Sequence, residues 1–283
     1  MGLINYNIEK YTPRQLVVIP LVLLVLSVVF ITMNMVTTGM PVTPGLDFSG
    51  GTAVTIRTTD THEQLQSVFA AYPLKEISDM NDAKFLKFGT MDDATSRSLS
   101  ALVSEKYPDA SINQISETFG KSLQSQAFIA LIFSFIGMAI VVFFSFRTFV
   151  PSVAVVLSAF ADMAMTAATM NILGITLTLG TTGALLMLIG YSVDSDILLT
   201  NRVLKRQGKL NEKLAGAFHT GIIMTSTTFA AITALFIVSW LGSIQILMEI
   251  SAVLLIGLAF DVLNTWLTNV GILKWYVLKG GGK

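Results

Sequence analysis

The chain has 283 residues, of which 53% are hydrophobic and only 13% are charged. Soluble globular proteins carry about a quarter charged residues, so this composition excludes an ordinary water-soluble protein of the same length. The formal net charge is zero, which argues against a nucleic-acid-binding protein with a broad basic face. The absence of cysteine excludes disulfides, thiolate catalysis and cysteine metal sites.

Six apolar runs, each about as long as the 20 residues that cross a bilayer, are separated by more polar segments. They cover residues 15–35, 126–146, 150–173, 176–200, 218–240 and 247–278. The first run is too long for a signal-peptide core and has no small-residue cleavage site, so we interpret it as an uncleaved span. The sequence therefore predicts an α-helical polytopic membrane protein with six transmembrane helices.

Basic residues mark one side of the predicted membrane. They lie before the first run, between the second and third, between the fourth and fifth, and after the sixth: Lys10, Arg14, Arg147, Arg202, Lys205, Arg206, Lys209, Lys213, Lys274, Lys279 and Lys283. The opposite connections at 171–175 and 242–245 carry none. Because positively charged loops stay in the cytoplasm, we expect segments 1–14 and 279–283 to be cytoplasmic and residues 36–125 to lie outside.

Residues 36–125 are polar enough to form a soluble domain. Alternating patterns predict strands at 52–57, 74–79, 84–88 and 110–117, with helices at about 61–72 and 90–107. Thr61 and Gln64 form a capping box at the start of the first helix. The order βαββαβ predicts a small α+β ferredoxin-like domain. The domain shows no nucleophile, base and acid constellation, and we interpret its histidine, His62, as a solvated residue.

The sequence GLDFSGG at residues 45–51 connects the first run to this domain. Gly45, Gly50 and Gly51 allow backbone torsions that other residues resist, and Asp47 can satisfy amide groups of the turn itself. We interpret the segment as a rigid elbow between membrane helix and sheet. The chain contains no GxxxxGK[ST] pattern, so we expect no nucleotide, and we expect no cofactor or metal.

Four aspartates fall inside the predicted spans: Asp162, Asp194, Asp196 and Asp261. An ionised aspartate at the centre of a span costs about 2.5–3.5 kcal/mol, so each should face the bundle interior, a partner or water. Burial favours the neutral carboxyl group, and a proton crossing the membrane yields about 2.3 kcal/mol per 100 mV. We therefore interpret the four aspartates as candidates for proton coupling. Sodium stays open as the coupling ion, although it would need additional oxygen ligands. For Asp261 a purely structural hydrogen bond between helices is an equal alternative.

Asp194 and Asp196 are two residues apart and point to different sides of a helix. Asp194 shares its face with Gly183 and Gly190, where a second helix can approach closely. Asp196 lies nearer Arg202 and can reach toward the cytoplasmic surface. We therefore expect Asp194 to be the buried member of the pair.

Further polar residues in the spans are interpreted as support through hydrogen bonds between helices: Tyr191, Thr225, Thr228, Asn264 and Thr268. Asn264 and Thr268 follow Asp261 at i+3 and i+7, so the three share one helix face. We interpret His219, at the cytoplasmic end of the fifth run, as an interfacial residue.

Several segments resemble the SecD and SecF family of protein-export subunits. The elbow sequence at 45–51 resembles the motif after the family's first span. Similar segments follow in the order of the SecF spans: AFAD at 159–162, GYSVDSD at 190–196, TSTT at 225–228 and DVLNTW at 261–266, the last being like archaeal SecF. The resemblance covers nearly the whole chain.

The resemblance implies one half of a two-subunit complex related to the RND transporters. The implied partners are a SecD-like subunit, a SecY-type translocon and a translocating polypeptide, all at the lipid bilayer and without nucleotide or nucleic acid. It further implies that the proton gradient drives the pulling or release of exported chains. The sequence departs from bacterial SecF at three positions. Bacterial SecF has asparagine and aspartate at the positions of Asp194 and Ser195, and it has an arginine at the position of Thr220.

Three functions remain open from the sequence. The first is a non-enzymatic accessory subunit of protein export that is coupled to protons. The second is an RND-like half-transporter for a lipid or small hydrophobic molecule, although drug pumps usually carry larger external modules. The third is a passive assembly subunit of the translocon.

Overall fold

The computed structural model describes residues 10–280. This part of the chain contains six helices that are long and apolar enough to cross a membrane. They are α1 Pro13–Thr38, α5 Glu117–Phe146, α6 Phe149–Leu173, α7 Leu179–Lys205, α8 Leu210–Leu241, and a continuous run of α9 Gln245–Leu263, the π-helical η1 Asn264–Asn269 and α10 Val270–Leu278. Together with a small α+β domain, they confirm the predicted fold class. The predicted terminal segments 1–14 and 279–283 lie partly outside the described residues.

Local sequence signals set the helix ends. At the start of α1, the Thr12 hydroxyl accepts a hydrogen bond from the Gln15 N–H at 3.3 Å, and the Gln15 side chain accepts one from the Thr12 N–H at 2.8 Å. The helix stops at Gly39, whose φ of +77° is a left-handed torsion that favours glycine. Helix α5 begins at Glu117, well before the apolar run, so it carries the chain from the sheet into the bundle without a break.

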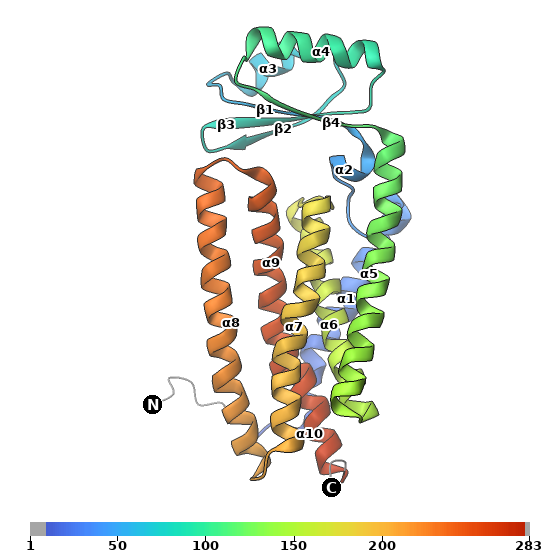
Figure 1. The fold of residues 1–283 in the computed structure, drawn as a ribbon, viewed down its shortest axis with the longest axis vertical. Helices are drawn as coiled ribbons and strands as arrows, with labels where there is room; N and C mark the ends of the chain where they lie inside the picture. The colour runs from blue at the N-terminus through green and yellow to red at the C-terminus, as the bar shows by residue number, and fades with distance from the viewer. Residues whose placement is uncertain (1–9, 281–283) are drawn as a thin grey trace.

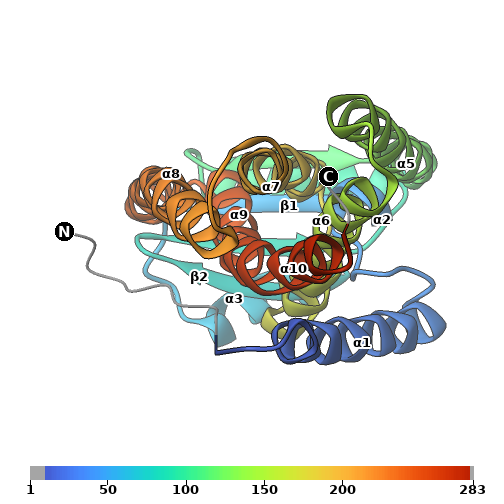
Figure 2. The same cartoon turned by 90° about the horizontal axis from the view of Figure 1, so that it is seen from below.

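Helices α6, α7 and α9 pack against one another, and α1, α5 and α8 lie toward the edge of the bundle (Figure 2). In the most apolar stretch of α6 and α7, 67% and 56% of the residues are buried, against 11% in α1, α5 and α8. The central helices therefore provide the interior of the protein, whereas the outer helices present most of their surface to lipid.

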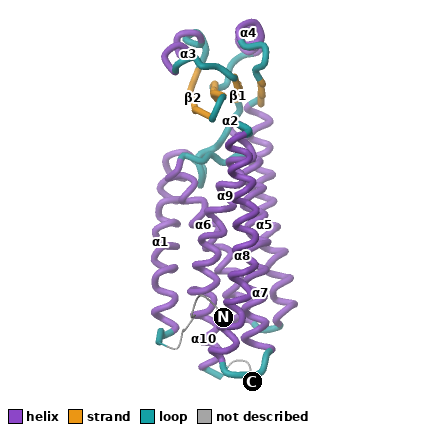
Figure 3. Tube along the Cα trace, turned by 90° about the vertical axis from the view of Figure 1, so that its left-hand side faces the viewer, coloured by secondary structure: helices purple, strands orange, loops and turns teal. Residues whose placement is uncertain are grey.

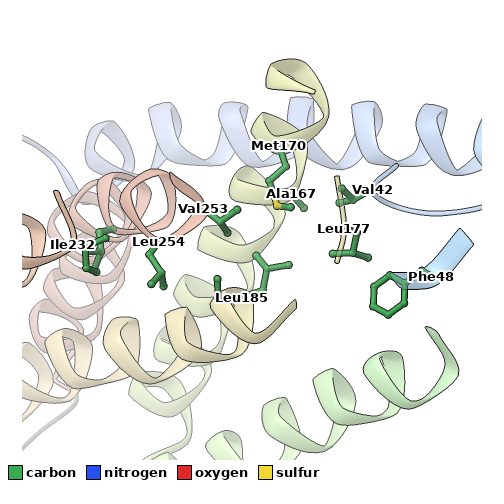
Figure 4. Packing of buried hydrophobic residues seen from close by; sticks show 11 residues of the cluster. Val42, Phe48, Ala167, Met170, Leu177, Leu185, Ile232, Val253 and Leu254 are labelled. Carbon is green, nitrogen blue, oxygen red and sulfur yellow. The ribbon is translucent and has the colours of Figure 1, made fainter. Parts of the chain in front are cut away.

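An apolar cluster fills the half of the bundle next to the sheet (Figure 4). Its buried members are Val42, Phe48, Ala167, Met170, Leu177, Ala184, Leu185, Ile232, Val253, Leu254 and Leu258. Val42 and Phe48 come from the segment between α1 and the sheet, and the others come from the bundle. The segment that leads from α1 to the sheet is therefore packed into the apolar interior of the bundle.

The external domain is a four-stranded antiparallel sheet with two helices on one face (Figures 1 and 3). Its elements are β1 Gly51–Ile56, α3 His62–Val68, β2 Leu74–Met80, β3 Ala83–Phe88, α4 Asp93–Lys106 and β4 Ser111–Ile115, with strand order β2-β3-β1-β4. Val54 and Leu86 of the sheet pack against Leu65 of α3 and Leu99 of α4. This is the predicted ferredoxin-like unit.

His62 lies at the surface of this domain, and its Nε2 is 3.0 Å from Oδ1 of Asp79. The ammonium group of Lys84 lies 2.6 Å from the same oxygen. The hydrogen bonds from Lys84 and His62 hold the pKa of Asp79 below its usual value. His62 is therefore an exposed residue with an acidic neighbour.

The elbow fits closely against the connection between α6 and α7. It contains the short helix α2, Leu46–Ser49. The Gly45 N–H donates a hydrogen bond to the Leu177 carbonyl at 2.7 Å, and a Cβ at Gly45 would lie 2.6 Å from a methyl group of Thr178. Gly50 and Gly51 have φ values of +72° and +128°, torsions that other residues rarely adopt. Only glycine fits these positions, which explains the composition of the motif.

Asp47 does not satisfy the turn in which it lies, contrary to the sequence prediction. Its Oδ2 instead accepts a hydrogen bond of 2.8 Å from the N–H of Leu179, the first residue of α7. The N-terminus of a helix carries unpaired N–H groups and a partial positive charge, which a carboxylate neutralises. The elbow is thus bonded directly to one of the central helices.

A second contact connects the sheet to the bundle. The Asn81 side chain in the β2–β3 turn donates a hydrogen bond to the Leu241 carbonyl at 3.2 Å, and the Ser243 hydroxyl donates one to Asp82 at 2.7 Å. The bond from Ser243 lowers the pKa of Asp82. The domain therefore touches the bundle both at α7 and at the α8–α9 connection.

The structure makes a prediction about alkaline stability. Tyr107 donates a hydrogen bond of 2.7 Å to Asp60, and burial together with this bond raises the pKa of Tyr107 to about 12. A raised pKa in the folded state stabilises the domain below the unfolded value of about 10, and this stabilisation is lost as the pH rises toward 12. Ultraviolet titration of tyrosinate in the full chain should show one late tyrosine that is missing in Tyr107→Phe. A titration curve of the same shape for both proteins would contradict the raised pKa of Tyr107.

Candidate functional site

Three of the four intramembrane aspartates meet at the centre of the bundle. Asp162 comes from α6, Asp196 from α7 and Asp261 from α9, and their exposed fractions are 0%, 0% and 1%. Desolvation disfavours ionised carboxyl groups in such a place unless strong partners compensate for it. The hydrogen bonds around these groups therefore decide what they can do.

Asp162 is bound by two neighbouring helices. The Ser192 hydroxyl of α7 donates to its Oδ2 at 2.6 Å, and the Asn264 amide of η1 donates to its Oδ1 at 2.7 Å. Asn264 in turn accepts a hydrogen bond from Thr268 at 3.0 Å. The carboxyl group thus joins α6, α7 and the sixth span in one polar network.

Asp196 and Asp261 share one hydroxyl group. Oγ1 of Thr265 lies 2.8 Å from Oδ1 of Asp196 and 3.1 Å from Oδ1 of Asp261. Oγ of Ser195 lies 3.1 Å from both Oδ1 of Asp261 and Oγ1 of Thr265. The Asn269 amide also donates to Asp196 at 2.8 Å. The two carboxyl groups are therefore linked through hydroxyl oxygens.

A count of protons shows what this arrangement requires. Among themselves, the four groups Asp196, Thr265, Asp261 and Ser195 make four oxygen–oxygen contacts of 3.1 Å or less. Ser195 and Thr265 supply one hydroxyl proton each, and an ionised carboxylate supplies none. Two hydroxyl protons cannot make all four contacts into hydrogen bonds. A proton on one of the two carboxyl groups adds a third donor and makes the network more completely hydrogen-bonded.

The hydrogen-bond donors named above for the three aspartates are all neutral hydroxyl or amide groups. None of the ion pairs between described residues includes Asp162, Asp196 or Asp261. Neighbouring carboxyl groups without a basic partner do not all ionise together. Within the described residues, no group of acidic, histidine or cysteine side chains is arranged to hold a metal ion. The three carboxyl groups therefore lie in an uncharged polar network of hydroxyl and amide groups.

The π-helical segment η1 explains how the sixth span supplies so many of these groups. It begins at Asn264 and ends at Asn269, immediately after α9, the helix that carries Asp261. The wider turn of a π-helix changes the direction of successive side chains, and such segments are frequent at functional sites. Asn264, Thr265, Thr268 and Asn269 are all buried, so the segment directs its polar side chains into the bundle.

The expectation that Asp194 is the buried member of the α7 pair is wrong. Asp194 is exposed on the outer surface of the helix, whereas Asp196 is fully buried. Asp194 shares its face with Gly183 and Gly190, as predicted, but a Cβ added at either glycine would meet no atom within 4 Å. The glycine face is therefore open in this chain alone, and the opposite face carries the network.

The predicted support residues divide into two groups. Asn264 and Thr268 belong to the network, as described above. Thr225 and Thr228 lie half-buried on α8, and the Thr228 hydroxyl bonds the Met224 carbonyl of its own helix at 3.2 Å. Tyr191 packs at the edge of the apolar cluster next to the sheet. The structure therefore does not bring Thr225, Thr228 and Tyr191 to the aspartates.

Arg202 of α7 reaches Thr220, one of the three positions at which the sequence departs from the expected SecF pattern. The Arg202 guanidinium of α7 donates to the Thr220 hydroxyl of α8 at 2.7 Å and also to the Gly216 carbonyl. His219, which we interpreted as interfacial, is exposed. Arg202 thus joins α7 to α8 near their connection instead of pairing with an aspartate of the network.

Sequence reasoning missed four participants: Ser192, Ser195, Thr265 and Asn269. A spacing signal was present for Thr265, which follows Asp261 at i+4 and contacts it at 3.1 Å. Ser192, Ser195 and Asn269 instead bond aspartates of other helices, so spacing along their own helix does not predict these contacts.

The network predicts the effect of removing one carboxyl group. Asp162→Ala leaves the Ser192 hydroxyl and the Asn264 amide without their acceptor, and each orphaned group costs about 1–3 kcal/mol. Asp162→Asn retains the shape and one acceptor oxygen. We expect the alanine variant to unfold at a clearly lower temperature than the asparagine variant in the same detergent. Equal unfolding temperatures for the two variants and the unchanged chain would disprove this role of Asp162.

Comparisons with known proteins agree with this architecture. A family model described as protein export membrane protein SecD/SecF, C-terminal, matches residues 95–279. A protein-export membrane protein SecF from Methanolacinia petrolearia is 57% identical over 99% of this chain and 100% of its own length. The SecF protein of Haloferax volcanii is 43% identical over 96% of this chain and 95% of its own length.

A solved structure shows the same fold. The crystal structure of SecDF, a translocon-associated membrane protein from Thermus thermophilus, matches with a TM-score of 0.75 at 20% identity. The match covers 94% of this chain and 38% of that longer chain. The sequence relatives, in contrast, are matched over almost their full length. The chain therefore belongs to the SecD/SecF family of protein-export membrane proteins and, within it, to SecF.

Proposed function

We propose that this SecF-family chain couples proton movement through its buried aspartates to protein translocation. SecF proteins are non-enzymatic accessory membrane proteins, so the work must come from binding and motion. The observation that supports the proposal best is the shared hydroxyl of Thr265, at 2.8 Å from Asp196 and 3.1 Å from Asp261. This group can pass a proton from one carboxyl group to the other by exchanging its own.

Proton occupancy would change the packing of the central helices. With a proton on Asp261 or Asp196, a third donor joins the network between α7 and the sixth span. Without it, both carboxyl groups are ionised and repel each other in a medium of low dielectric constant. One charge moved across 100 mV supplies about 2.3 kcal/mol, which is sufficient to bias a helix movement between two states.

The structure offers a route from α7 to the external domain. Asp47 of the elbow bonds the first residue of α7 at 2.8 Å, and the same helix carries Asp196 in its second half. The sheet also contacts the α8–α9 connection through Asp82 and Ser243. A shift of α7 relative to α9 would therefore tilt the sheet, and the sheet would act on an emerging polypeptide.

The proposed orientation follows from charge. Arg147, Arg202, Lys205 and Lys279 lie at helix ends away from the sheet (Figure 1). Basic loops remain in the cytoplasm, which supports a cell-membrane protein with cytoplasmic termini and an external sheet. Under this proposal the external domain meets exported chains as they leave a SecY-type translocon.

The open face of α7 is the proposed contact with a SecD-like partner. An exposed carboxylate in a membrane helix is costly, and Asp194 lies beside Gly190, which leaves room for a close helix. A partner helix with a basic or hydrogen-bonding side chain would both fill the space and pair with Asp194. This heterodimer accounts for the small residues that the chain leaves uncovered.

Exchange of Asp196 tests proton coupling. Asp196→Asn is nearly isosteric and keeps a hydrogen-bonding side chain, but it carries no transferable carboxyl proton. We expect the complex to assemble in normal amount and to lose most of the export stimulation that depends on the proton gradient. Export of a secreted precursor into membrane vesicles measures this, with Asp93→Asn in the external helix α4 as the control. Unchanged gradient-dependent export in Asp196→Asn would support a passive assembly subunit.

Exchange of Gly190 tests the partner face. Gly190→Leu fills the space beside Asp194 and should reduce co-purification of the SecD-like subunit severalfold. Gly137→Leu on α5 is the matched control, because Gly137 also lies in a membrane helix with nothing within 4 Å of its side-chain position. If both variants retained the partner equally, the interface would have to lie elsewhere.

Exchange of Asp47 tests the route to the sheet. Asp47→Ala removes the hydrogen bond from the Leu179 N–H at the start of α7, at a cost of about 1 kcal/mol, whereas Asp47→Asn can still accept that bond. We expect faster hydrogen exchange of the first amides of α7 and slower export in the alanine variant, with both nearly normal in the asparagine variant. Slower export without a change in exchange would argue against capping as the cause.

A further inference from the structure

A groove lies between α1 and α10, where α1 begins and α10 ends. Its volume is about 500 Å³, and its lining comes from residues 13–21 of α1 and 271–275 of α10. Val17, Val18, Leu21 and Ile272 make its wall apolar, and Arg14 and Trp275 stand at its end. From Pro13 to Leu21 the groove follows α1 for about 12 Å.

Close contact between the two helices forms the floor of the groove. Gly271 is buried, and a Cβ there would lie 2.6 Å from a methyl group of Val17 and 3.1 Å from the Pro13 carbonyl. The Lys274 ammonium donates to the Tyr11 carbonyl at 2.8 Å, which holds the start of α1 to α10. The groove is therefore a fixed feature of the packing and not a gap between loosely placed helices.

The end of the groove is basic. Arg14 is exposed and forms no ion pair with another described residue. Lys279 lies over the ring of Trp275, 4.6 Å from its centre. Arginine binds phosphate oxygens with two parallel hydrogen bonds, and tryptophan and lysine favour the headgroup region of a bilayer. The charge of this end is thus complementary to a phosphate group, and the wall beyond it is complementary to a hydrocarbon chain.

We propose that this groove binds one anionic phospholipid, with the phosphate on Arg14 and one hydrocarbon chain along Val18 and Leu21. The volume is within the usual range of about 300–1,000 Å³ for ligand sites. The lipid would fill the space between a peripheral helix and the sixth span, which carries the π-helical segment. It would therefore stabilise α1 against the part of the bundle that holds the aspartate network.

Native mass spectrometry of the full chain, with phosphatidylglycerol or phosphatidylcholine added to the detergent, tests the site. Arg14→Gln should bind phosphatidylglycerol about tenfold more weakly, because a charge-assisted hydrogen bond to the phosphate is lost. Phosphatidylcholine carries the same phosphate but also a choline cation that offsets its charge, so it should bind the unchanged chain more weakly than phosphatidylglycerol does and should lose less affinity in Arg14→Gln. Val18→Trp should fill the groove and weaken both lipids. Arg97→Gln on the exposed face of α4 is the matched control and should leave both unchanged.

Three results would overturn the proposal. The first is equal phosphatidylglycerol binding by Arg14→Gln and the unchanged chain. The second is unchanged binding of both lipids by Val18→Trp, because the hydrocarbon chain would then lie elsewhere. The third is loss of the bound lipid when the chain is purified with its SecD-like partner, because the groove would then belong to a partner helix.

Discussion

The main physical constraint on this structure is the free-energy cost of burying carboxyl groups inside a lipid-embedded helix bundle. Asp162, Asp196 and Asp261 are almost completely buried, and the donors found around them are neutral. Such a group is tolerated when it is protonated or when several donors share its charge. The Thr265 hydroxyl between Asp196 and Asp261 serves both needs, because it donates to one carboxyl group and can accept from the other. The burial of α6 and α7 and the π-helical turn in the sixth span are the structural conditions for this contact.

The external domain is attached to the same helices that carry the acids. The elbow contributes Val42 and Phe48 to the apolar cluster and Asp47 to the start of α7. A protein that only needed to hold an external domain could use a flexible linker of polar residues. Here the glycines of the elbow permit backbone contacts too close for any side chain, so the elbow is held directly against its neighbours. This rigidity is what a coupling mechanism requires, since a flexible connection would lose the movement.

Most of the fold could be predicted from the sequence, because the apolar runs, the capping box at Thr61 and the strand alternation are local signals. The candidate site could be predicted only in part. The aspartates were identifiable by their cost in a membrane, but the choice of Asp194 as the buried acid was wrong. Glycines near Asp194 show that a helix can approach, yet they do not say whether that helix belongs to the same chain. The cap formed by Asp47 also required the structure, because it joins residues 132 positions apart.

The most direct test of the central claim is infrared spectroscopy of the chain in lipid bilayers with isotope-labelled aspartate. Protonated carboxyl groups absorb separately from ionised ones, so the method reports the protons themselves. We predict a protonated aspartate band at neutral pH that weakens in Asp261→Asn and in Asp196→Asn but persists in Asp194→Asn. A spectrum without protonated aspartate at neutral pH would contradict the claim, because all three buried groups would then be ionised.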